Sequence, residues 1–170
     1  MALLEASAEI APQDFEEPYF WLGRYQLSRG NLGAAKVNLE RAVSLDRYAV
    51  MATATLALVK TMFGENAEKI RLARRAVALA PGSHTCQYAL GSVLQETGFH
   101  EEAAQALGRA VQLRGTNLSS VDARHRLAVA LTALGNHGRA QSLWESVLRA
   151  DPVHIGALKG LGRLSDGATP

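Results

Sequence analysis

Residues 84–117, HTCQYALGSVLQETGFHEEAAQALGRAVQLRGTN, contain the pattern that decides the fold. In the first half of this stretch, the pair Leu90-Gly91 precedes Gly98 by seven residues. In the second half, small and apolar residues recur at three- and four-residue spacing, which places them on one face of a helix. Glycine ends helices because it adopts the left-handed backbone conformation at low cost. The stretch therefore predicts two helices joined by a tight turn at Gly98.

The same arrangement recurs along the whole chain. Glycines mark it at Gly30, Gly64, Gly98 and Gly135, with spacings of 34, 34 and 37 residues, and a pair of Leu with Gly or Ala precedes each of them by seven residues. Two helices joined by a tight turn cannot bury both of their apolar stripes alone, so such units must stack on their neighbours. The sequence therefore predicts an all-α stack of helix-turn-helix units.

Composition supports the same fold class and excludes several functions. Ala and Leu supply 53 of the 170 residues, whereas Val and Ile supply 14, so strong helix formers dominate. A net charge of +2 is too small to indicate nucleic acid or an anionic membrane as a partner. The single cysteine, Cys86, cannot form an internal disulfide. No apolar run is long enough for a membrane span, and without a secretory signal we expect a cytoplasmic location.

This unit resembles the tetratricopeptide repeat (TPR), a helix-turn-helix repeat of 34 residues with a W-x2-L-G-x2-Y…A-x3-F…P signature. The first unit matches it through Tyr19, Leu22-Gly23, Gly30, Ala35, Leu39 and Ala42. The sequence departs from the signature at Lys69, where the family prefers Ala, and at the Tyr position, which is occupied by Gln26, Lys60, Leu94 and Leu131. The resemblance implies a right-handed superhelical solenoid in which first helices line a concave groove and second helices face outward.

The alignment of the units gives the expected organisation of one continuous domain, 1–170. Its parts are a partial leading repeat helix at 1–15, four units at 16–49, 50–83, 84–117 and 121–154, and a C-terminal capping helix at 155–164. Residues 3–12 align with the end of a second helix, so the chain is expected to begin inside a repeat and to be an excerpt from a longer array. A short protein with an abbreviated N-terminal cap is the alternative.

The resemblance also implies which side chains face the groove. Carried onto this sequence, the predicted peptide-binding residues are Phe20, Trp21, Arg24, Leu27, Met51, Thr55, Leu58, Met62, Tyr88, Ser92, His125, Arg126 and Arg163. Apolar residues on a curved surface mark interaction sites, and aromatic, Met and Arg residues are enriched at interfaces. We expect apolar anchors around Trp21, Leu58 and Tyr88, and acidic groups of the partner near Arg126 and Arg163. Packing of Phe20 and Trp21 against the preceding helix is the alternative.

One known ligand of this family can be tested against the sequence. Units that bind the C-terminal Glu-Glu-Val-Asp peptide of the heat-shock chaperones Hsp70 and Hsp90 hold its two carboxylates with Lys, Asn and Arg at fixed positions. Starting from the second unit, the corresponding residues here are Ala54, Leu58, Ala89, Asp122 and Arg126. Only Arg126 fits, so we do not expect this chain to bind that peptide.

The chain offers little for catalysis or for cofactors. Its five histidines form no metal-binding pattern on a single helix, and no glycine-rich phosphate loop occurs. Asp122 and His125 lie three residues apart on one predicted helix, but no Ser or Cys nucleophile is placed beside them. The densest basic run, Lys69 to Arg75, lies on a second helix and is expected to be a solvated face. No cofactor or metal is expected.

We therefore expect a non-enzymatic protein–protein interaction module, a scaffold or adaptor that binds a peptide segment of another protein in its groove. Two alternatives remain open. The chain could be a self-associating assembly subunit that associates through its apolar N-terminal face, because the end of a solenoid is exposed when its neighbouring repeat is missing. It could also be a regulatory or substrate-docking segment of a larger TPR-containing enzyme.

Overall fold

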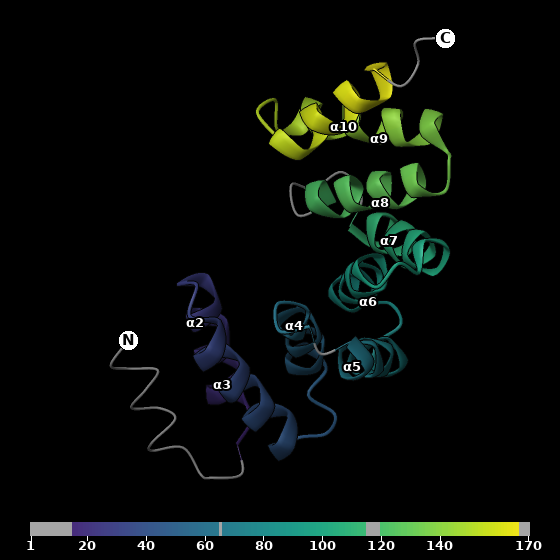
Figure 1. The fold of residues 1–170 in the computed structure, drawn as a ribbon. Helices are drawn as coiled ribbons and strands as arrows, with labels where there is room; N and C mark the ends of the chain where they lie inside the picture. The colour runs from purple at the N-terminus through teal and green to yellow at the C-terminus, as the bar shows by residue number, and fades with distance from the viewer. Residues whose placement is uncertain (1–14, 65, 115–119, 167–170) are drawn as a thin grey trace. The chain divides into compact units, whose positions relative to one another are not determined.

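The computed structural model describes residues 15–64, 66–114 and 120–166, and within these ranges the regular structure is helical, with no strand (Figure 1). The helices are α2 (Glu17–Ser28), α3 (Leu32–Leu45), α4 (Val50–Thr61), α5 (Asn66–Leu79), α6 (His84–Glu96), α7 (His100–Arg114), α8 (Val121–Ala133), α9 (His137–Ala150) and α10 (Ile155–Asp166). The predicted all-α helical-repeat fold is confirmed. The predicted leading helix at 1–15 lies outside the described residues, apart from Phe15.

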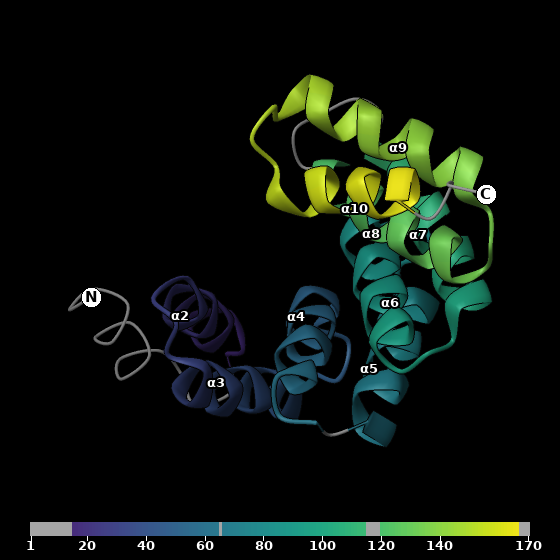
Figure 2. The same cartoon turned by 45° about the horizontal axis from the view of Figure 1, so that its top comes forward.

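Consecutive helices pack in antiparallel pairs, α2 with α3, α4 with α5, α6 with α7 and α8 with α9, and α10 packs on α9 and α8 (Figure 2). Each pair falls within one of the unit ranges that the sequence predicts. The chain divides into two compact units, an N-terminal unit, Met1–Pro81, and a C-terminal unit, Gly82–Pro170, where the sequence predicts one continuous domain. The division falls at Pro81-Gly82, between α5 and α6, where neither residue favours continuing a helix.

Glycine ends the first helix of every pair, as predicted. Gly30, Gly64, Gly98 and Gly135 have φ angles of 76°, 71°, 85° and 75°, the left-handed region that other residues rarely adopt. After α2, the N–H of Gly30 donates to Leu27 O (3.0 Å) and the N–H of the next residue donates to Gln26 O (2.9 Å). These two bonds make a Schellman motif, which satisfies the last carbonyls of the helix. The same pair of bonds follows α6 and α8.

A second kind of glycine lets paired helices approach closely. A Cβ at Gly91 in α6 would lie 2.5 Å from Leu107 Cγ in α7, and a Cβ at Gly23 in α2 would lie 2.8 Å from Leu39 Cγ in α3. Leu39 and Leu107 are fully buried at these crossings. The Leu-Gly pair of the repeat pattern therefore marks the crossing point of the two helices of a unit.

The N-terminal unit also contains two buried lysines. Lys60 in α4 is 2% exposed, and its Nζ forms ion pairs with Glu40 Oε1 of α3 (2.8 Å) and Glu68 Oε2 of α5 (3.0 Å). It therefore ties three successive helices together. Lys69 is 3% exposed. The prediction that the whole basic run is a solvated face is therefore wrong at this residue, because Lys69 occupies the inward position that alanine fills in the other units.

Candidate functional site

The N-terminal unit has a hollow of about 310 Å³ formed by the first turns of α2 and α4 and the turn that precedes α4. Its lining residues are Glu16, Glu17, Phe20, Trp21, Asp46, Tyr48, Ala49, Val50, Met51 and Ala52. Three large side chains of this lining remain accessible, with exposed fractions of 46% for Trp21, 40% for Met51 and 63% for Tyr48. Accessible aromatic and Met side chains around a hollow are typical of an interaction site.

The Trp21 side chain is held in place by its neighbours on α2. Its Nε1 donates to Glu17 Oε1 (3.3 Å), and the guanidinium of Arg24 lies 5.5 Å from the indole centroid and 5.8 Å from the Phe20 centroid. The Phe20 and Trp21 rings are 5.1 Å apart. Phe20 itself is 9% exposed and belongs mainly to the core. Cation–π and hydrogen-bond contacts with its own helix therefore orient the Trp21 indole.

The other predicted groove residues of this unit differ in accessibility. Arg24 and Met62 are exposed, and Leu27 and Leu58 are half-buried. Thr55 is buried, with 8% of its surface exposed, and its hydroxyl donates to Met51 O (2.7 Å) of its own helix. Thr55 is therefore the least accessible of these residues.

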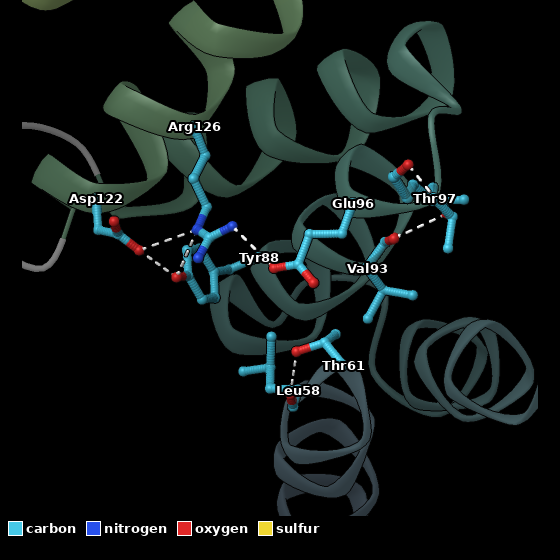
Figure 3. Close-up of polar contacts among 9 residues, drawn as sticks. Leu58, Thr61, Tyr88, Val93, Glu96, Thr97, Asp122 and Arg126 are labelled. Carbon is cyan, nitrogen blue, oxygen red and sulfur yellow. Dashed lines mark hydrogen bonds and ion pairs between the residues drawn. The ribbon is translucent and has the colours of Figure 1, made fainter. Parts of the chain in front are cut away.

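In the C-terminal unit, Arg126 of α8 already has carboxylate partners (Figure 3). Its Nη1 lies 3.6 Å from Glu96 Oε1 at the end of α6, and its Nε lies 3.4 Å from Asp122 Oδ2 one turn earlier on α8. The same Nε donates to Tyr88 Oη (3.1 Å), and Tyr88 Oη donates to Asp122 Oδ2. The structure thus places the predicted residues Tyr88 and Arg126 beside two acids, Asp122 and Glu96, all within the C-terminal unit.

The electrostatics of this cluster follow from its burial and its charges. Burial raises the pKa of the Tyr88 hydroxyl above its ordinary value, and the hydrogen bond to Asp122 raises it further. Burial alone would lower the pKa of Arg126, but Tyr88, Asp122 and Glu96 outweigh that effect and raise it. Arg126 therefore stays charged, and an incoming acid must compete with Asp122 and Glu96 for it. Ser92, also predicted for the groove, is fully buried and does not reach the surface.

A second hollow, of about 430 Å³, lies between α8 and α10 in the C-terminal unit, with α9 beneath it. Its lining residues are His125, Val129, Thr132, Ala133, Trp144, Gly156, Lys159, Gly160 and Arg163. The α8 members recur at three- and four-residue spacing, as do the α10 members, so each helix presents a single face. Trp144 of α9 is 3% exposed. It forms the floor of the hollow.

The predicted residue His125 is bonded to this floor. Trp144 Nε1 donates to His125 Nδ1 (3.1 Å), and the ring of His154 lies 4.8 Å away, centroid to centroid. Burial lowers the pKa of His125, and the neighbouring His154 lowers it further. The hydrogen bond requires an unprotonated Nδ1, so the geometry and the pKa shift both favour the neutral imidazole.

Sequence reasoning did not identify Trp144 as the floor of the second hollow. Trp144 stands nine residues after Gly135, the core position that Leu39 and Leu107 occupy after Gly30 and Gly98, and the pattern did not single out Gly156, Gly160 or Tyr48. The sequence of α10 did contain a signal for this hollow. Gly156 and Gly160 lie four residues apart, as do Lys159 and Arg163, so both pairs lie near one face of the helix.

Three further features bear on function. Within residues 15–64, 66–114 and 120–166, no three His, Cys, Asp or Glu side chains lie together as a metal site would require. Over the same part of the chain, no helix combines the length and apolarity that crossing a bilayer demands. Cys86 is buried, which raises the pKa of its thiol and keeps it from acting as a thiolate.

The comparisons with known proteins agree with this geometry. Residues 16–48, the first predicted unit, match the sequence model of the tetratricopeptide repeat. The match supports the resemblance to the tetratricopeptide repeat that the repeat pattern predicts. No curated protein sequence matches it.

Solved structures share the fold over most of the chain. The thermophilic TPR protein TTC0263 of Thermus thermophilus superposes with a TM-score of 0.73 at 19% identity, covering 96% of this chain and 88% of that one. The APC/C hetero-tetramer Cut9-Hcn1 gives a TM-score of 0.84 at 19% identity, covering 95% and 32%. A mutant O-GlcNAc transferase of Thermobaculum terrenum gives 0.73 at 26% identity, covering 85% and 28%. The chain thus spans about a third of the latter two proteins.

The class of function follows from the fold. Tetratricopeptide repeats are in general non-catalytic scaffolds for protein–protein interaction, although some enzymes, such as O-GlcNAc transferase, carry them. The chain has the architecture of such a scaffold.

Proposed function

We propose that this chain binds a peptide segment of another protein on the faces of its first-type helices, α2 and α4 in the N-terminal unit and α6, α8 and α10 in the C-terminal unit. The proposed contact residues are the accessible members of the predicted set, Trp21, Arg24, Leu27, Met51, Leu58, Met62, Tyr88, His125 and Arg163. Arg126 joins them where a partner acid displaces Asp122 or Glu96.

The observation that carries this proposal is the hollow of the N-terminal unit. Trp21 and Met51 line it together and leave 46% and 40% of their surfaces to solvent, and neighbouring exposed apolar side chains around a hollow are typical of an interaction site. The hollow is large enough, at about 310 Å³, for one apolar side chain of a partner. Binding energy in such interfaces comes from a few buried aromatic and apolar contacts and not from total area.

The experiment is a selection of random peptides on the immobilised chain, followed by affinity measurements on the selected peptides. We expect Trp21→Ala with Met51→Ala to weaken those that use this hollow by about tenfold or more. The matched control is Val37→Ala on α3, a second-type helix, because Val37 is 64% exposed and lies away from the hollow. Equal affinity of the double variant and the wild type for every selected peptide, with helicity unchanged, would contradict the proposal at this hollow.

Self-association is a second candidate, and one feature favours it. Ile155 and Leu158 at the start of α10 are exposed by 67% and 50%, and Val153 in the turn before it is exposed by 77%. A second copy could cover this apolar surface. Analytical ultracentrifugation at rising protein concentration tests it. A wild-type dimer that becomes monomeric in the double variant Ile155→Ser with Leu158→Ser would support self-association. A wild-type chain that stays monomeric at every concentration would exclude it.

A regulatory or docking segment of a larger enzyme is the third possibility, and the 26% identity to the O-GlcNAc transferase favours it. The reading frame that encodes this chain distinguishes this third function from peptide binding alone and from self-association. A frame that continues into a catalytic domain would support it.

A further inference from the structure

The hollow of the C-terminal unit carries charge of one sign only. Its lining contains two cations, Lys159 and Arg163 of α10, and no carboxylate. Both cations are exposed, and they lie four residues apart on the face of α10 that borders the hollow. Arg126 on α8, in contrast, has Asp122 and Glu96 as partners. The positive potential at the rim of this hollow is therefore not compensated by the residues that line it.

The floor of the hollow is apolar because its polar groups bond elsewhere. Trp144 Nε1 donates to His125 Nδ1 (3.1 Å), and the hydroxyl of Thr132 donates to Ala128 O (2.9 Å). The remaining lining from α8, Val129 and Ala133, has only carbon in its side chains. An occupant that brought a polar group against Trp144, Val129 and Ala133 would lose its own hydration without gaining a hydrogen bond from these three side chains.

Glycines bring α10 into direct contact with this floor. A Cβ at Gly160 would lie 2.5 Å from Trp144 Cε2, and a Cβ at Gly156 would lie 2.6 Å from His125 Cε1. Larger residues at these positions would push α10 away from α8 and α9. The two glycines therefore fix the depth of the hollow and hold Lys159 and Arg163 at its edge.

We propose that this hollow binds an acidic peptide motif of a partner protein, an aliphatic or aromatic side chain with one or more carboxylates close to it in sequence. The apolar side chain packs on Trp144, Val129 and Ala133, and the carboxylates bind Lys159 and Arg163 through charge-assisted hydrogen bonds. This inference rests on the proposed function and adds the chemistry of the partner at one site. Charge complementarity selects this occupant over a neutral or basic peptide.

The test uses the same random-peptide selection, with three variants of the full chain. Lys159→Glu with Arg163→Glu reverses the rim charge at exposed positions, and Ala133→Leu places a larger side chain in the hollow from an exposed position at the end of α8. Arg139→Glu with Arg149→Glu is the matched control, because it makes the same charge change at exposed positions on α9. Circular dichroism establishes that each variant is folded.

We expect the wild-type chain and the control to enrich peptides with Leu, Ile, Phe or Met close to Asp or Glu, and both hollow variants to lose them. For a resynthesised peptide, exchange of its carboxylates for amides should weaken binding by about tenfold, and higher salt should weaken binding of the acidic form. Enrichment of peptides without acids, or of acidic peptides that both hollow variants still bind, overturns this inference and leaves the proposed function in place. Enrichment of no peptide at all overturns both.

Discussion

Gly91 is the residue at which α6 crosses α7, with Leu107 directly opposite. A methyl group there would overlap Leu107 and approach its backbone nitrogen at 3.0 Å, so relief requires a shift of the helix itself. Gly108, in α7 of the same unit, has no atom within 4 Å of the corresponding position. A side chain is therefore excluded by close packing at Gly91, whereas at Gly108 there is room for one.

We predict that Gly91→Ala lowers the free energy of unfolding by about 1–3 kcal/mol, the usual cost of overpacking. Gly108→Ala should leave it unchanged or raise it by about 0.5–1 kcal/mol, because alanine is the better helix former and its methyl group meets open space. Urea denaturation followed by far-ultraviolet circular dichroism measures both. Equal effects of the two substitutions on the free energy of unfolding would show that the close approach of α6 and α7 does not contribute to stability.

Lys60 is the residue that joins three helices of the N-terminal unit through charge. Its side chain is 3% exposed, whereas those of Glu40 and Glu68 are 43% and 44% exposed. Because both acids are partly hydrated, and Glu68 also lies 3.6 Å from Arg71, removal of the lysine leaves neither carboxylate buried without water or a partner.

We predict that Lys60→Met destabilises the N-terminal unit by about 1–2 kcal/mol, less than the cost of stranding a fully buried charge. The control is Arg71→Met, which removes an exposed cation 3.6 Å from Glu68 and should cost no more than about 0.5 kcal/mol. Thermal unfolding of the three proteins gives the comparison. A Lys60→Met protein as stable as the wild type would mean that its two ion pairs merely offset the cost of burying the charge.

At the scale of the element, α8, α9 and the turn before α10 meet at the imidazole of His125, which accepts a hydrogen bond from Trp144 in its neutral form. The groups that face His125 are Trp144 from α9, His154 from the turn before α10, and Asp122 and Arg126 on its own helix. Burial and His154 lower its pKa, and Asp122 opposes them without reversing the shift. The unfolded chain therefore binds a proton at this residue at a higher pH than the folded chain.

We predict that stability contributed by neutral His125 is fully present above its ordinary pKa of 6.5 and is lost as pH falls through the lower pKa of the folded state. The thermal midpoint should fall between about pH 7.5 and about pH 5.5. His125→Gln should reduce this dependence, whereas His137→Gln, an exposed residue at the start of α9, should leave it as it is. A midpoint that is flat over this range, or equally steep in both variants, would rule out a role for His125.

The helices were predictable from the sequence, but many contacts between them were not. The positions of the four turn glycines and the Leu-Gly pairs predicted the helix pairs, because the φ angle at a turn and the space at a crossing each admit few residue types. Periodicity also gave the face on which a side chain lies. It could not give partners, so it missed that Arg126 is engaged by Asp122 and Glu96, and that Trp144 forms the floor of a hollow. Those contacts join residues on different helices.

At the scale of the whole molecule, each unit presents one hollow on its first-type helices, at α2 and α4 in the N-terminal unit and at α8 and α10 in the C-terminal unit. The first is aromatic and Met-lined, and the second combines an apolar floor with two cations. The sequence predicts apolar anchors around Trp21, Leu58 and Tyr88, and acidic groups of the partner near Arg126 and Arg163. In the structure Arg126 has Asp122 and Glu96 as partners, whereas Lys159 and Arg163 are exposed at the second hollow.

The most direct test of peptide binding by the first-type helices is nuclear magnetic resonance of the nitrogen-15-labelled chain during titration with a selected peptide. The account predicts that amide shifts concentrate on α2 and α4, or on α8 and α10, around the hollows that these helices line. Shifts confined to the second-type helices α3, α5, α7 and α9, with the residues of the hollows unaffected, would contradict it.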